Sequence, residues 1–215
     1  MKYTKTESVL WLVFAGPCFR YLSSQGIPVD RRRAKKIYRE LAARTPDIGG
    51  IKENPLRMCL SAGMVWLSVY EAADGKLPDE TFGQMVERSM CTPLIQAVYN
   101  RKAQTAFTLE AQKKRADVAA KTNVLAKDNP FHWSCEVLLG RDADEYTINY
   151  HQCGLCALGR QEKLPRLVPY LCVLDTLTID WMGGVLRRTK TLATGGDCCD
   201  FYLCRKGSKW DEKQK

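Results

Sequence analysis

The sequence lacks any hydrophobic run long enough to cross a membrane. Its longest apolar run near the start, residues 9–15, is far shorter than the ~20 residues that span a bilayer. Two lysines precede the run, but Gly16-Pro17-Cys18 after it makes a poor signal-peptide cleavage site. We therefore expect a cytoplasmic protein that does not interact with membranes.

The sequence also lacks a nucleic-acid-binding motif, although its net charge is +9. The basic residues are spread over several separate clusters, and no helix-turn-helix, zinc-finger or aromatic stacking pattern accompanies them. This distribution excludes nucleic acid as the expected partner. Two interpretations remain open: solvated helix faces, or a basic pocket for a small anionic substrate.

Histidine is scarce, with only two residues, whereas cysteine is abundant, with ten. A short secreted chain with this cysteine count would be a disulfide scaffold, but without an export signal we expect reduced thiols. Cys153-x-x-Cys156 would need two more ligands to hold zinc. Cys198 and Cys199 are neighbours on a predicted strand and point to opposite faces, so they are poor joint ligands. We expect no metal and no other cofactor, and the pair is left as core packing or as reactive thiols.

The periodicity of apolar residues changes at Asp128-Asn129-Pro130, from helical spacing before it to alternation after it. The first part predicts a helix over residues 7–23 with a break or kink at Gly16-Pro17, and a helix over 31–44 capped by Asp30. Further helices are predicted over 55–73, 78–90 and 93–127. The charged half of the last helix, residues 110–121, should face solvent or cross a partner subunit, which suggests a possible homodimer.

The second part predicts strands over residues 133–139, 146–150, 185–194 and 199–205. A short helix over 153–158 and a helix ending at Trp181 separate the two pairs, and Gly195-Gly196-Asp197 forms the turn of the second pair. We therefore predict an α+β fold in one domain: a helical N-terminal half followed by a small antiparallel β-sheet domain (strand-strand-helix-strand-strand) covered by helices. The expected parts are 1–128, 129–206 and a charged tail, 207–215.

Four spaced elements carry a family resemblance. They are Cys153, then Cys172-x-x-Asp175, then Arg188-Thr189-Lys190-Thr191, and finally Gly195-Gly196-Asp197-x-Cys199-Asp200-Phe201. Over roughly residues 133–205 the chain resembles the L-2-amino-thiazoline-4-carboxylic acid hydrolase family. The resemblance implies a cytosolic hydrolase that adds water to a cyclic amidine and releases the ring thiolate, giving an N-carbamoyl-cysteine-like product. The α+β part also looks like small-molecule-binding domains related to four-vinyl reductases, so a non-catalytic binding module is the alternative.

Cys172 and Asp175 are three residues apart on one predicted helix, so both can reach a single pocket. A thiolate nucleophile and a carboxylate acid/base suit addition to an amidine carbon. The family motif adds Cys199 as a third catalytic candidate. Asp175 could instead be a structural carboxylate that caps backbone amides or pairs with a nearby cation such as Arg188.

A planar guanidinium suits a substrate carboxylate, and Arg188 stands at the family's Arg-Thr position. An ordinary salt bridge from Arg188 to Asp175 or Asp200 is the alternative. The remaining substrate-binding candidates are Thr189, Thr191, Cys153, His151 and Asp200. By alternation Asp200 faces away from Cys199, and a structural role for it is equally open.

Overall fold

The computed structural model describes residues 1–212 and divides into two compact units. Unit 1 comprises residues 1–92 and 157–171, and unit 2 comprises 93–156 and the chain from 172 onward. Helices α7 (Gly154–Gln161) and α8 (Val168–Trp181) each begin in one unit and end in the other. Residues 213–215 of the expected charged tail lie outside the described residues.

Unit 1 is helical. It contains α1 (Lys5–Ser24), α2 (Arg31–Arg44), α3 (Arg57–Ala72), α4 (Asp79–Met90) and the short 3-10 helix η1 (Pro165–Leu167). Asp30 caps α2 as predicted, because its carboxylate accepts the N–H groups of Arg32 and Arg33. Of the predicted break or kink in the first helix, the break is wrong: α1 continues through Pro17. Burial of Phe14, Ala15, Cys18 and Phe19 around the proline offsets the lost hydrogen bond, which costs roughly 3 kcal/mol.

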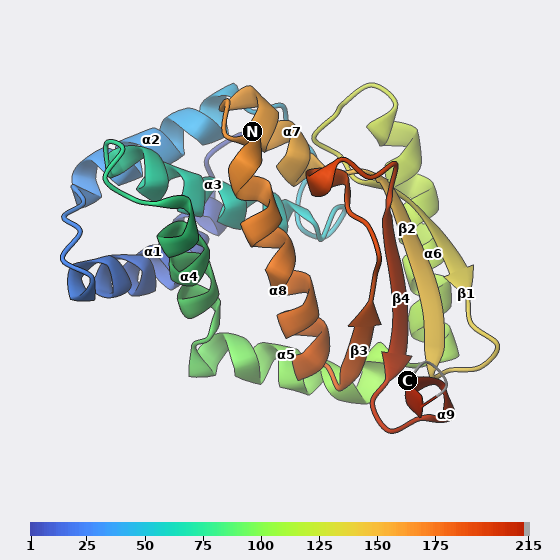
Figure 1. Cartoon of the computed structure of the whole chain (residues 1–215). Coiled ribbons are helices and arrows are strands. Elements are labelled where there is room, and N and C mark those ends of the chain that lie inside the picture. The colour runs from blue at the N-terminus through green and yellow to red at the C-terminus, as the bar shows by residue number, and fades with distance from the viewer. Residues whose placement is uncertain (213–215) are drawn as a thin grey trace. The chain divides into compact units, whose positions relative to one another are not determined.

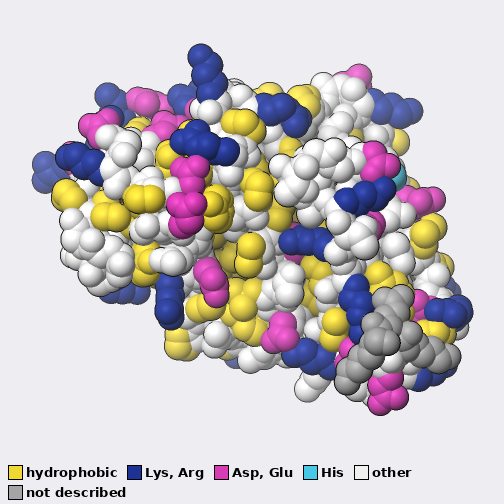
Figure 2. Space-filling model, viewed as in Figure 1, with side chains coloured by type: hydrophobic (Ala, Val, Ile, Leu, Met, Phe, Trp, Pro, Cys, Tyr) yellow, Lys and Arg dark blue, Asp and Glu magenta, His cyan; other side chains and the backbone are white. Residues whose placement is uncertain are grey.

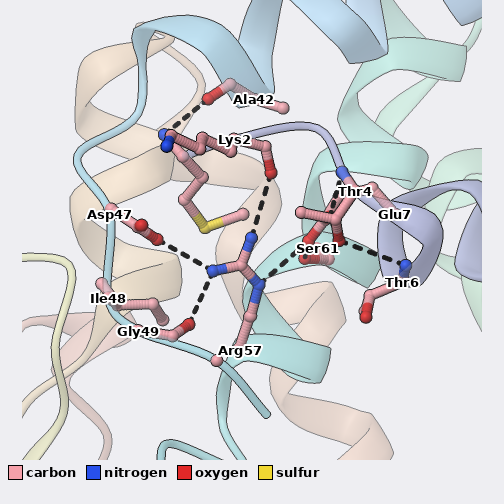
Figure 3. A network of polar contacts seen from close by, with 12 residues as sticks. Lys2, Thr4, Thr6, Glu7, Ala42, Asp47, Ile48, Gly49, Arg57 and Ser61 are labelled. Atoms are coloured by element: carbon pink, nitrogen blue, oxygen red, sulfur yellow. Dashed lines mark hydrogen bonds and ion pairs between the residues drawn. The ribbon is translucent and has the colours of Figure 1, made fainter.

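A buried ion-pair network ties the start of the chain to α3 (Figure 3). The Arg57 side chain is 5% exposed, and it donates to Glu7 at 3.0 Å and to Asp47 at 2.8 Å. Its remaining N–H groups reach the backbone carbonyls of Gly49 and Lys2. Glu7, fully buried, also accepts hydrogen bonds from Thr4 and Ser61. Both buried charges of this network, on Arg57 and Glu7, therefore have partners.

Unit 2 begins with two helices where the sequence predicted one. α5 (Pro93–Ala106) and α6 (Leu109–Ala126) are separated at Phe107 and Thr108. The Thr108 hydroxyl accepts the N–H of Ala111 at 3.0 Å and so caps a new helix. Phe107, 1% exposed, packs into the core of the sheet instead of continuing the helix.

A four-stranded antiparallel sheet forms the rest of unit 2 (Figure 1). Its strands are β1 (Ser134–Leu139), β2 (Glu145–Gln152), β3 (Gly184–Arg187) and β4 (Cys199–Arg205), in the order β1-β2-β4-β3. Helix α6 packs along β1, and a last short helix, α9 (Lys209–Glu212), contacts β4. The predicted α+β fold, with a helical first half and two strand pairs separated by helices, is confirmed.

The third strand is shorter than predicted, because β3 ends at Arg187 and not at residue 194. The Asp200 carboxylate accepts the backbone N–H groups of Thr189 and Lys190 at 3.0 and 2.9 Å, so these groups cannot pair with a strand. Thr191 then caps a 3-10 turn, η2 (Leu192–Thr194), which ends at Gly195 with φ +89°. A positive φ of this size favours glycine.

One face of the sheet is the core of unit 2. Tyr146, Ile148, Phe201 and Leu203 pack there with Phe107. α6 turns Gln112, Ala119, Thr122 and Ala126 inward, so the stretch 110–121 is solvent-facing on part of its surface only. No helix within residues 1–212 is long and apolar enough to span a bilayer. Lysine and arginine side chains are interspersed with acidic ones on the face shown in Figure 2.

Candidate functional site

An acid–guanidinium pair lies at the edge of the sheet in unit 2. Arg188 donates to Oδ2 of Asp175, on α8, at 2.9 Å and to the backbone carbonyl of Cys172 at 2.8 Å. Its guanidinium lies 5.4 Å from the centroid of the Phe201 ring on β4, a cation–π distance. Arg188 thus joins α8 to the inner face of the sheet.

The pleat of β3 determines where Arg188 points. Successive side chains of a strand alternate between faces, and Arg187, the last residue of β3, turns outward. There it donates to the carbonyls of Trp210 and Asp211, in and beside α9. Arg188, the next residue, turns inward to Phe201 and Asp175.

Asp175 is subject to two opposing effects. Desolvation raises the pKa of its carboxyl to about 6, while the charge and hydrogen bond of Arg188 lower it. The side chain keeps 41% of its surface exposed, so water screens part of the desolvation effect. A carboxylate with a raised pKa next to a guanidinium can exchange a proton near neutral pH.

Four thiols surround this pair. Cys153, Cys156, Cys172 and Cys199 interact electrostatically with one another, and Cys153, Cys172 and Cys199 also interact with Asp175. Burial raises the pKa of Cys172 to about 12, and it also raises the pKa of Cys199. Both are therefore neutral thiols at physiological pH. The Cys199 sulfur accepts the N–H of Leu192 at 3.2 Å.

Cys153 differs from these thiols because its pKa is lowered. The main cause is a hydrogen bond from the Cys156 thiol, and the backbone N–H groups of Cys156 and Leu155 add to it against the opposing effect of burial. Cys153 immediately precedes α7, where N–H groups without helical partners favour an anion.

Thr189, Thr191 and Asp200 hold the segment after β3. The Asp200 carboxylate accepts the Thr189 hydroxyl at 2.6 Å in addition to the backbone groups described above. Thr191 is 8% exposed and exchanges hydrogen bonds with Thr194. These contacts fix the backbone that carries Arg188.

His151 lies apart from the other candidates. It is exposed, and it lines a recess between α6 and β1 together with Asn123 and Cys135. Its neighbour Tyr150 packs against the inner face, so the pleat places His151 on the other face of the sheet. The structure therefore brings Cys153, Cys172, Cys199, Asp175 and Arg188 together without His151.

Two further residues complete the cluster. The Cys156 thiol donates a hydrogen bond to the Cys153 sulfur, and the Phe201 ring lies against the Arg188 guanidinium. Cys-x-x-Cys and Cys199-x-Phe201 were the sequence signals for them, but neither signal predicts which group they contact. Among residues 1–212 no group of three or more histidine, cysteine or acidic side chains is arranged to hold a metal ion.

Comparison with known proteins gives one match. A family model described as L-2-amino-thiazoline-4-carboxylic acid hydrolase matches residues 57–203. Searches of curated proteins and of solved structures found no match to this chain. The matched stretch covers more than half of the sequence and contains all the residues of the cluster. The chain belongs to the L-2-amino-thiazoline-4-carboxylic acid hydrolase family.

Proposed function

We propose that this protein hydrolyses a small cyclic amidine that carries a carboxylate, of the 2-amino-thiazoline-4-carboxylate type. One water adds to the carbon between the ring sulfur and the two nitrogens, and the bond from this carbon to sulfur breaks. The sulfur leaves as a thiolate and takes a proton, which gives an N-carbamoyl-cysteine-like product. A cytoplasmic location would keep the thiols reduced, and no disulfide joins the ten cysteines, all of which lie within residues 1–212.

The contact between Asp175 and Arg188 amid the thiols is the observation that carries this proposal. Arg188 is the group for the substrate carboxylate, because a guanidinium binds a carboxylate through two parallel hydrogen bonds. Asp175 is the base that takes a proton from water. When the substrate carboxylate engages Arg188, Asp175 loses part of the interaction that lowers its pKa and becomes a stronger base.

The other candidates take supporting roles in this proposal. Cys172 and Cys199 line the site as neutral thiols, and Cys153 contributes a thiol whose pKa is lowered. Thr189, Thr191 and Asp200 keep the segment that carries Arg188 in place. His151 would reach the substrate only after a rearrangement of β2, so we give it no step.

The test is to incubate purified protein with 2-amino-thiazoline-4-carboxylate, to follow free thiol, and to identify the product by its mass gain of one water. We expect thiol release that Asp175→Asn abolishes and Asp180→Asn leaves intact. Asp180 is a matched control, because it lies on α8 but pairs with Lys206 at the surface. No thiol release together with a ligand-dependent rise in melting temperature would instead identify a binding module, and would refute the proposed hydrolysis.

A further inference from the structure

The backbone on both sides of Cys153 is held firmly. Before it, the Gln152 side-chain amide donates to the carbonyls of Ala126, Asn129 and His132 at 3.0 to 3.1 Å. This clamp fastens the end of β2 to the loop that precedes β1. Three hydrogen bonds restrict the conformations of the Gln152 side chain, and they also restrict the backbone of Cys153, the next residue.

After Cys153, Gly154 begins α7 in close contact with the same loop. A Cβ at this position would lie 2.3 Å from the carbonyl oxygen of Phe131 and 2.6 Å from the Trp133 ring. Only glycine fits such an approach without movement. Cys153 is thus placed between two fixed neighbours, a degree of positioning that a packing cysteine does not need.

The Cys153 sulfur faces hydrogen-bond donors. It accepts the N–H groups of Leu155 and Cys156 at the start of α7 and the thiol of Cys156. It also lies within electrostatic range of Asp175, the base of the proposed reaction. The other thiols of the cluster contrast with it, because the pKa values of Cys156, Cys172 and Cys199 are all raised.

We propose that Cys153 is the nucleophile of this site and forms a covalent adduct with the amidine carbon of the substrate. This inference rests on the proposed function and adds to it the identity of the attacking group. Cys156, which donates to the sulfur and does not touch the reacting carbon, is a positioning residue.

The covalent reaction has two steps, and atoms and charges balance over both. In the first, the electron pair of the Cys153 thiolate forms a sulfur–carbon bond, the ring carbon–sulfur bond breaks, and the departing ring thiolate takes a proton from solvent. This leaves an isothiourea that joins Cys153 to the opened substrate. In the second step water adds to the same carbon while Asp175 takes its proton. The bond to Cys153 then breaks, the thiolate is restored, and Asp175 returns its proton to solvent.

Ionisation of Cys153 can be tested without turnover. We would titrate the ultraviolet absorbance of thiolate in the wild type and in Cys153→Ser, Cys172→Ser and Cys59→Ser. Mass mapping of each cysteine after brief iodoacetamide treatment near pH 7 would accompany it. We expect the thiolate that forms at the lowest pH to be the one that only Cys153→Ser removes, and preferential alkylation of Cys153. A signal that survives in Cys153→Ser would overturn the assignment, whether or not the protein is active.

The covalent step is tested by rapid quench of the wild type with 2-amino-thiazoline-4-carboxylate, followed by intact mass. We expect an adduct with the mass of the substrate on the peptide that contains Cys153, and a kcat of Cys153→Ser reduced by about three orders of magnitude or more. Exposed Cys59 is the control, and Cys59→Ser should keep wild-type activity.

The outcomes separate the two proposals. A wild type that turns over while Cys153→Ser keeps its rate refutes the nucleophile and leaves the hydrolysis standing. A wild type that opens no thiazoline refutes the hydrolysis, and the titration then decides on Cys153 alone. Cys156→Ser should raise the pH at which the thiolate forms, whereas a purely structural role for Cys156 would leave this pH unchanged.

Discussion

Two opposing effects determine the pKa of the Asp175 carboxyl. Desolvation favours its neutral form and Arg188 favours its charged form, and the net result is a raised pKa near about 6. Because the folded state holds this proton more tightly than the unfolded chain, stability contributed by Asp175 is present below the unfolded pKa and is lost as pH rises through the folded one. A base must be charged to act, so activity has the opposite dependence on pH.

We predict that kcat/KM of the wild type rises with pH through the pKa of Asp175, close to pH 6. Asp175→Asn should remove this limb of the profile together with most of the activity, since the amide cannot take a proton. Asp180→Asn should keep the limb. Initial rates of thiol release between pH 5 and 8 provide the measurement, and an unchanged limb in Asp175→Asn would exclude Asp175 as the base.

At the scale of elements, the segment between β3 and β4 determines where Arg188 lies. A carboxylate on β4, that of Asp200, replaces the strand pairing that residues 189 and 190 would otherwise make. Its pKa is lowered, because hydrogen bonds from Thr189 and from the Lys190 backbone outweigh the effect of burial. The backbone of residues 189 and 190 is therefore held by one side chain, that of Asp200.

We predict that Asp200→Ala lowers the free energy of unfolding by about 1–2 kcal/mol and raises KM, since Arg188 loses its fixed backbone. Asp197→Ala is the matched control. Asp197 lies in the same segment but pairs with Lys190 at the surface, with 79% of its side chain exposed, so its loss should leave the free energy of unfolding nearly unchanged. Denaturant unfolding and steady-state kinetics measure both quantities; equal effects of the two variants would contradict this role for Asp200.

The sequence predicted elements better than their ends. Alternation placed Asp200 on the face of β4 opposite to Cys199, and the structure adds that Cys199, Phe201 and Leu203 form the inner face, because burial selects one face of a strand. The single helix over 93–127 was wrong, since a threonine cap at residue 108 has no effect on helical spacing on either side. The predicted length of β3 was wrong because the backbone N–H groups of Thr189 and Lys190 donate to the Asp200 side chain instead of to a neighbouring strand.

The candidate site was predictable only in part. Cys172 and Asp175 both lie on the predicted helix, α8, and the salt bridge from Arg188 to Asp175, which the sequence offered as an alternative, is present. His151, close to Cys153 in sequence, is separated from the cluster by the pleat. The special environment of Cys153 depends on the N–H groups of a helix and on Gln152, and no local pattern reveals such contacts.

At the scale of the whole molecule, the two units are stabilised in different ways. Unit 2 has an apolar core on one face of a sheet. Unit 1 includes a buried charge network around Arg57 and Glu7. Arg57 is the first residue that the family model matches. Whether the chain forms a homodimer stays a prediction, which sedimentation would test.

We predict that Arg57→Met destabilises the protein by about 3–5 kcal/mol, because it leaves the Glu7 carboxylate buried without its partner. Arg33→Met should leave the stability nearly unchanged, since the Arg33–Asp74 pair is exposed and screened by water. Burial alone would raise the pKa of Glu7, but hydrogen bonds from Thr4 and Arg57 outweigh this effect, and the net pKa is lowered. Its contribution should therefore be present at neutral pH and be lost as pH falls through the folded pKa. Thermal unfolding of both variants at pH 4 and pH 7 provides the measurement.

We propose that Asp175, Arg188 and the surrounding thiols form one site for a carboxylate-bearing amidine. The most direct measurement is the ratio of kcat/KM for 2-amino-thiazoline-4-carboxylate to that for 2-amino-thiazoline without the carboxylate, in the wild type and in Arg188→Gln. We expect the wild type to favour the carboxylate, and Arg188→Gln to reduce this preference by roughly 10- to 100-fold, the value of a charge-assisted hydrogen bond. An unchanged preference in Arg188→Gln would show that the carboxylate binds elsewhere and would contradict the account.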